Sequence, residues 1–217
     1  YPFGQRENWL KDELDFISES DHCPIVIPRR YEPDTQKISR FNPNIMIINI
    51  AMISTKIFLE TMMNIVTVFS FKNLILITHQ SQGLFDWLKR FVVLPKTYAT
   101  LKQVKNLNAV HIHCYSTTTV ATMGAILSRE LAIPFSFTLH TSAQLTERCR
   151  SSYRSIVMAS AFVRTISQKT KDDLQLFFSD LQLRIHKVHL GLRIDAHSKK
   201  KIAIQTLSSY PKIIMVC

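Results

Sequence analysis

His140 and Thr141 form a polar pair that directly follows the apolar run at 135–139. A neutral imidazole can donate or accept one hydrogen bond, so it can hold a hydroxyl group without acting as a strong base. His140 is therefore the first candidate for a catalytic or binding side chain. The alternative is a histidine at the end of a strand whose hydrogen bonds serve the fold alone.

Two further histidines, His111 and His113, lie in the earlier apolar run at 109–114. Residues two apart on a strand face the same side, and Cys114 follows them, so a metal site is one interpretation. The sequence offers no fourth ligand at a regular spacing, and we expect no metal here. We instead expect His111 to be packed and His113, at the exit of the strand, to lie near a binding pocket.

The segment 109–141 has the pattern of a strand, a helix and a second strand. In such a βαβ unit, the residues after the second strand lie at the carboxyl edge of a parallel sheet. Open α/β sheets bind their ligands at that edge. The unit therefore positions His140 and Thr141 where a ligand is expected.

The rest of the chain alternates between the same two kinds of element. We expect helices at 7–20, 55–71, 84–106, 146–158 and 168–178, with Pro95 breaking the third and Ser167 capping the last. We expect strands at 24–28, 45–53, 161–166, 184–190 and 212–217, and a loop at 29–44. This alternation predicts an α/β fold with a doubly wound, mainly parallel, Rossmann-like sheet.

Common glycine-rich loops are absent from the sequence, which contains neither GxGxxG nor GxxxxGK[ST] and no GxSxG. An anion at the sheet edge must therefore be held by side chains or by plain helix N-termini. Of the four glycines, Gly4 and Gly191 lie at predicted junctions, where a missing side chain lets a ligand approach the backbone.

The chain has 217 residues, of which 46% are hydrophobic and 20% charged, and its net charge is +11. This composition excludes a disordered or fibrous chain. The positive charge indicates an anionic partner, namely a nucleotide diphosphate, a nucleic acid or an acidic lipid headgroup; a solvated basic surface is the alternative. Because the basic residues are not interleaved with aromatic ones, we expect no binding of nucleic acid.

The sequence also indicates where in the cell the protein is located. The chain begins without a signal-peptide pattern, and its four cysteines include no CxxC pair, so we expect a reducing, cytoplasmic compartment. Polar residues interrupt the apolar stretch 45–77 too often for a spanning helix. The basic amphipathic segment 84–106 indicates peripheral contact with an anionic membrane, on the inner face of the cell membrane; a helix packed in the core is the alternative.

Four segments carry a family resemblance: 1–14 with its Tyr-Pro-Phe-Gly start, 110–142 with His140, 161–167, and 187–195. Together they resemble the N-terminal domain of the family 4 retaining glycosyltransferases, which have the GT-B fold and include bacterial polysaccharide-assembly enzymes. The resemblance implies transfer of a sugar from a nucleoside diphosphate sugar to a carbohydrate or lipid-linked acceptor, with retention of configuration.

The same resemblance implies roles for individual residues. It gives His140 an active-site role in the cleft between two domains, near the transferred sugar, and it gives Gly4, His113 and Thr141 roles in substrate binding. It implies no cofactor and no catalytic metal. The alternative is a non-catalytic α/β domain that binds a membrane or a partner, as a degenerate glycosyltransferase remnant.

The resemblance also implies a division of the chain. We expect residues 1–195 to form the acceptor-side domain, without its first strand, and residues 196–217 to form a linker and the first strand of a C-terminal donor-binding domain. On this interpretation the chain is truncated at both ends and transfers no sugar on its own.

Overall fold

The computed structural model describes residues 8–20, 22–28, 44–51, 54–181, 184–188 and 212–216. Its strands are β1 (Cys23–Ile27), β2 (Met46–Ile47), β3 (Ala109–Cys114), β4 (Phe135–Leu139), β5 (Phe162–Thr165), β6 (Ile185–Lys187) and β7 (Lys212–Val216). Its α-helices are α1 (Asn8–Glu19), α3 (Thr55–Met63), α4 (Ile65–Val68), α5 (Phe71–Gln80), α6 (Leu84–Val92), α7 (Leu94–Val104), α8 (Thr119–Leu131), α9 (Arg150–Ala159) and α10 (Gln168–Phe177). Two short 3₁₀ turns, η1 (Ser142–Gln144) and η2 (Glu147–Cys149), precede α9.

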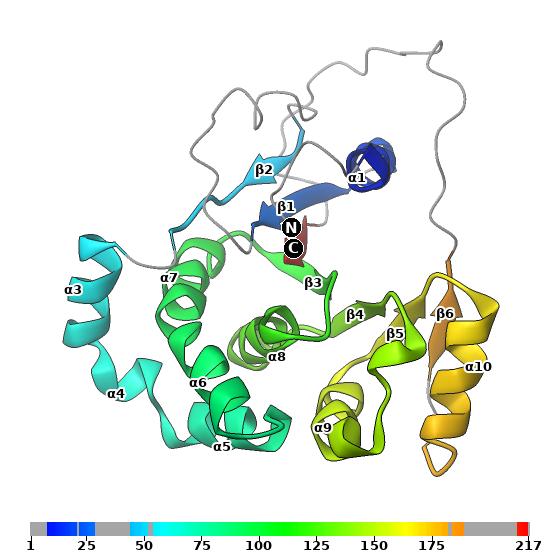
Figure 1. The fold of residues 1–217 in the computed structure, drawn as a ribbon. Coiled ribbons are helices and arrows are strands. Elements are labelled where there is room, and N and C mark those ends of the chain that lie inside the picture. Colours follow the sequence, from blue (N-terminus) through cyan, green and yellow to red (C-terminus); the bar gives the residue numbers. More distant parts are fainter. Residues whose placement is uncertain are drawn as a thin grey trace.

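The described strands form one seven-stranded sheet in the order β2-β1-β7-β3-β4-β5-β6. Every described pairing between neighbouring strands is parallel. Helix α1 lies on one face of the sheet, and α7, α8 and α9 lie on the other (Figure 1). The predicted α/β fold with a doubly wound, Rossmann-like sheet is therefore confirmed, and the described sheet is parallel throughout.

The two faces of the sheet have separate cores. The larger core lies between the sheet and α8, where Ile112, Cys114 and Phe137 pack with apolar residues of α7, α8 and α9. The smaller core lies under α1, where Leu10 and Leu14 pack on Val26 and Met215. Burial of both faces explains why β1 and β7 are nearly continuous apolar runs.

The predicted βαβ unit is formed by β3, α8 and β4. Helix α8 ends at Leu131 and is capped by Ala132, whose left-handed φ of 54° is typical of helix C-termini. Halfway along α8, Gly124 lies against the sheet, and a Cβ built there is only 2.2 Å from Sγ of Cys114. The missing side chain of Gly124 therefore lets the helix approach β3 closely.

Two predicted helix boundaries are confirmed, and two predicted elements differ in extent. Pro95 lies in the first turn of α7 and the helix breaks before it, at Val93, as predicted. Ser167 caps α10 by accepting a hydrogen bond from the backbone N–H of Thr170, also as predicted. The helix expected at 55–71 is instead two helices that meet at Asn64, and the strand expected at 45–53 is only the two-residue β2.

The position of β7 differs from the sequence interpretation. The sequence interpretation assigns 212–217 to the start of a second domain, whereas Lys212–Val216 lies at the centre of the one described sheet, between β1 and β3. Its Ile214 and Val216 enter the larger core and Met215 the smaller one, which suits a strand that is apolar on both faces. The predicted division at residue 195 falls outside the described residues.

Candidate functional site at the carboxyl edge of the sheet

The candidate site lies where β3 and β4 end side by side. The two strands are in register, with Cys114 opposite Phe137, so Tyr115 and His140 follow at the same edge. His140 is half-buried, and its Nε2 lies 2.9 Å from the backbone oxygen of Tyr115. A carbonyl oxygen can only accept, so Nε2 carries the hydrogen and the ring is oriented by the backbone of the neighbouring strand.

His111 and His113 face the same side of β3, as the spacing predicts, and both contact Ser136 of β4. The Oγ atom of Ser136 lies 2.7 Å from Nε2 of His111 and 2.8 Å from Nδ1 of His113. The other ring nitrogen of His113, Nε2, lies 2.8 Å from Oγ1 of Thr138. Alternate residues of the two strands therefore form a continuous chain of hydrogen bonds on one face of the sheet.

Burial holds this chain of hydrogen bonds in a neutral state. Burial, with a smaller effect from the positive charge of Arg164, lowers the pKa of His113 from 6.5 to about 3. Burial also lowers the pKa of His111. Neutral rings suit this arrangement because each can donate from one nitrogen and accept at the other.

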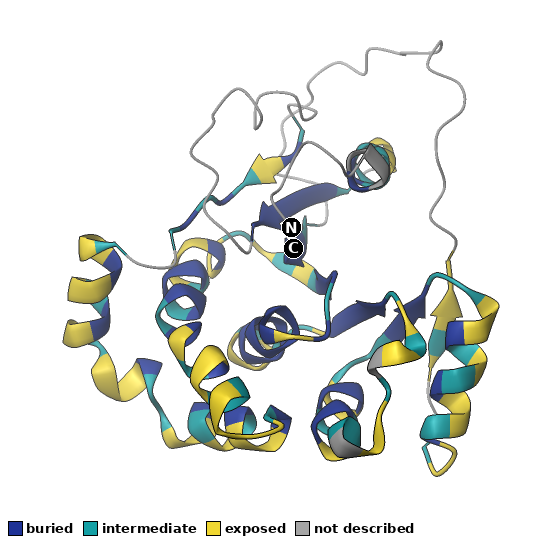
Figure 2. Cartoon of the chain, viewed as in Figure 1, coloured by how far each residue is buried: buried dark blue, intermediate teal, exposed yellow. Residues whose placement is uncertain are grey.

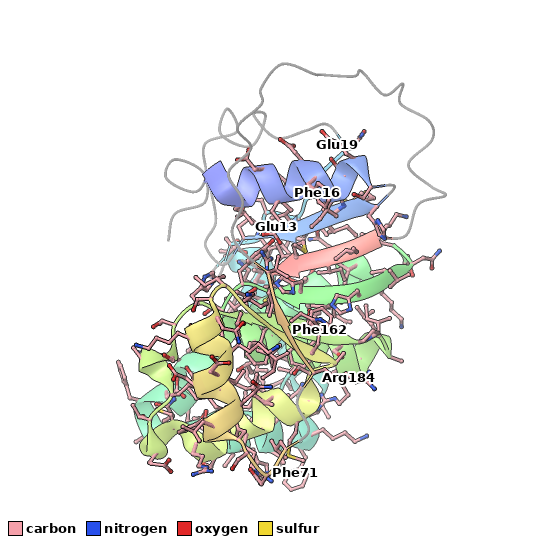
Figure 3. The ribbon with its side chains drawn as sticks, turned by 90° about the vertical axis from the view of Figure 1, so that its right-hand side faces the viewer. Glu13, Phe16, Glu19, Phe71, Phe162 and Arg184 are labelled. Atoms are coloured by element: carbon pink, nitrogen blue, oxygen red, sulfur yellow. The ribbon has the colours of Figure 1, made fainter. Side chains whose placement is uncertain are left out.

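An ion pair connects this layer to α1. Arg164 of β5 is opposite Thr138 of β4, and its guanidinium donates to the carboxylate of Glu13. Both side chains are largely buried, and Glu13 lies on the side of α1 that faces the sheet (Figure 3). The pair therefore fixes α1 across the face that carries the histidines.

The other predicted site residues have different surroundings. Thr141 is exposed, and its Oγ1 accepts a hydrogen bond from the backbone N–H of Ala143, which caps η1. The ring of His113 is buried, and it connects β3 to β4 through Ser136 and Thr138 instead of lining an open pocket. Gly4 and Gly191 lie outside the described residues. The structure thus brings His140 and Thr141 to one edge, with His113 two residues before Tyr115 on the adjoining strand.

No group of three His, Cys, Asp or Glu side chains in the described ranges has the geometry of a metal site. A pocket of about 360 Å³ lies at the opposite edge, where β5 begins. Its lining includes Ser160, Phe162 and Arg184. Figure 3 shows Phe162 and Arg184 near one another. This pocket contains none of the residues predicted to form the site.

Sequence reasoning did not identify several residues of this layer. Ser136 and Thr138 alternate with Phe135, Phe137 and Leu139, so a period of two was present as a signal that one face of β4 is polar. The contact between Glu13 and Arg164 had no such signal because 151 positions separate the two residues.

Fold and site together define an α/β protein with a doubly wound parallel sheet and a histidine at its carboxyl edge. Comparison of the chain with protein-family models, curated proteins and solved structures finds no match. The assignment of function therefore depends on the residues and geometry described above.

Proposed function

We propose that the chain is the acceptor-side part of a retaining glycosyltransferase with the GT-B fold. The reaction is transfer of a sugar from a nucleoside diphosphate sugar to a carbohydrate or lipid-linked acceptor, at the cytoplasmic side of the cell membrane. The observation that carries the proposal is the position of His140, which directly follows β4 at the edge where open parallel sheets bind ligands.

The orientation of the His140 ring suits the binding of a sugar hydroxyl. Nε2–H donates to the backbone oxygen of Tyr115, so the ring is held in one orientation at the edge of the sheet. A half-buried side chain that is fixed in this way can position a sugar hydroxyl that contacts it. His140 contributes by positioning the reacting groups, which can lower a barrier without a strong base.

The buried layer beneath the edge supports this role. Strand β3, which ends one residue before Tyr115, is held to β4 by the hydrogen bonds of His113 with Ser136 and Thr138. These bonds connect the two strands just before the point where His140 contacts Tyr115. In this proposal the departing diphosphate is stabilised by cationic groups and helix N-termini, mainly in a C-terminal donor-binding domain.

The proposal is tested with the product of the complete gene and a set of nucleoside diphosphate sugars, with lipid extracts and oligosaccharides as acceptors. We expect acceptor-dependent release of the nucleoside diphosphate. The new glycosidic bond, examined by NMR, is expected to keep the anomeric configuration of the donor. Inversion contradicts the retaining mechanism, and lack of turnover with every donor contradicts the assignment as an enzyme.

A further inference from the structure

The exposed apolar side chains of this protein are concentrated on four consecutive helices. Of the eighteen large apolar residues that are exposed in the described part of the chain, twelve lie on α3, α4, α5 and α6. They are Phe58, Leu59, Met62, Met63, Ile65, Val66, Phe71, Ile75, Leu84, Phe85, Leu88 and Val92. We call these residues the apolar rim. Figure 2 shows exposed residues along all four helices.

The helices of the apolar rim are two-sided. On α6, Leu84, Leu88 and Val92 recur every four residues along one exposed face, whereas Arg90 on the opposite face is buried. On α3, Ile57 and Thr61 are buried, and the apolar residues around them are exposed. One side of each helix thus packs on the protein and leaves an apolar side uncovered.

The described part of the chain contains no single helix that is long and apolar enough to cross a membrane. The nearest candidate is α3 together with 65–80, and the two parts are bent by 91° at their junction. The buried faces of these helices belong to the cores around α7 and α8, through Ile57, Val68 and Ile77. The helices are therefore held on the body of the protein, with their apolar faces outward.

Positive charge accompanies the apolar rim. Lys56, Lys72 and Lys89 are exposed on the same helices, where the acidic residues are Glu60 and Asp86. Asp86 forms an ion pair with Arg90, at 3.0 Å, so its charge is compensated. This charge is complementary to an anionic surface.

Lys89 shows how charge and apolar surface are combined. Its Nζ lies 4.3 Å from the centre of the Phe85 ring, so the positive charge lies directly beside an exposed aromatic side chain of the apolar rim. At a membrane interface a lysine in such a position can place its stem in the apolar layer and its amine among the headgroups. Amphipathic helices with a basic flank lie in the plane of such interfaces.

We propose that the apolar rim docks the protein on an anionic lipid membrane, with α3–α6 lying along the interface. This surface shares α6 with the basic segment 84–106 that the sequence indicates, but it does not include α7, in which six residues are buried. Lys96 of α7 is only 1% exposed, and its Nζ donates to the backbone oxygen of Pro28. The proposal does not depend on glycosyl transfer, since lipid binding can occur without it.

The test is sedimentation of this chain with vesicles of phosphatidylcholine alone or mixed with phosphatidylglycerol. The test variant is Leu84→Gln with Phe85→Gln, two residues that are 76% and 72% exposed. The matched control is Leu176→Gln with Met158→Gln, at 78% and 66% exposed but outside the apolar rim. Neither pair fills a core, so both variants are expected to fold.

We expect the chain to bind the anionic vesicles and to be released by salt. The test variant is expected to lose about tenfold or more in partition coefficient, while the control binds like the original chain. Equal binding by both variants overturns the proposal, and so does equal binding to vesicles without phosphatidylglycerol. If the apolar rim instead joins two copies, the test variant changes the mass in solution without affecting vesicle binding, which also overturns it.

Discussion

At the scale of single residues, the buried ring of His113 links folding to pH. Its pKa in the folded chain is about 3, below the value of 6.5 that an exposed histidine has. Between these values the unfolded chain binds a proton that the folded chain does not. Stability is therefore greatest above about pH 6.5 and is lost as the pH falls toward 3.

The corresponding prediction concerns the pH dependence of unfolding by urea. Lowering the pH from 7 to 5 is expected to cost on the order of 2 kcal/mol through His113 alone. We expect His113→Gln to remove this part of the pH dependence. The control His79→Gln, which replaces an exposed histidine, is expected to leave the pH dependence unchanged. An unchanged pH dependence in His113→Gln contradicts the neutral buried ring.

The ion pair of Glu13 and Arg164 is the second feature at this scale. Each charge is largely buried, so removal of one partner leaves the other without its compensation. We expect Arg164→Met to lower the free energy of unfolding by about 3 kcal/mol. Adding Glu13→Leu is expected to restore part of that loss, measured as a double-mutant cycle in urea. Strictly additive effects would show that the pair does not fix α1 to the sheet.

At the scale of elements, the close approach of α8 to β3 depends on Gly124. An alanine Cβ there would overlap with Sγ of Cys114, which is itself fully buried. Gly124→Ala is expected to destabilise the chain by about 1–2 kcal/mol, because this overlap exceeds the gain in helix propensity.

The sign of this effect should reverse when the sulfur is removed. In a Cys114→Ala background the added methyl group has space, so Gly124→Ala becomes neutral or stabilising by up to about 1 kcal/mol. Thermal unfolding of the four variants measures the difference. A loss of the same size in both backgrounds shows that Cys114 is not the limiting contact.

The elements also show what local sequence can predict. Pro95 and Ser167 mark a helix start through their own backbone and side-chain chemistry, so both positions were correctly predicted. The break at Asn64 lacks a proline or glycine signal. There the backbone N–H of Asn64 donates to the carbonyls of Glu60 and Thr61, and both α3 and α4 contact α7, so the break follows from packing between distant segments.

The site was predictable only where it depends on local sequence patterns. The βαβ pattern of 109–141 located His140 and Thr141 at the carboxyl edge, because this follows from the handedness and direction of parallel strands. The backbone contact of His140 with Tyr115 depends on the register of β3 and β4. That register, like the central position of β7, is set by packing between distant segments and has no local signal.

At the scale of the whole molecule, two separate surfaces carry the two proposed functions, sugar transfer and membrane docking. The carboxyl edge carries His140, and the apolar rim lies on helices packed outside α7 and α8. Figure 3 shows Phe71 of the rim at the end of the molecule opposite Glu13 and Glu19 of α1. Docking on a lipid surface through the rim is therefore expected to leave α1 and its face of the sheet uncovered.

Sugar transfer by the complete gene product carrying His140→Ala decides whether this histidine takes part in the reaction. We expect a loss of about a hundredfold or more in kcat/KM with little change in stability, because His140 is half-buried at an edge. The His79→Ala control, which alters an exposed histidine on α5, is expected to keep full activity. Full activity of His140→Ala would show that His140 has no role in sugar transfer.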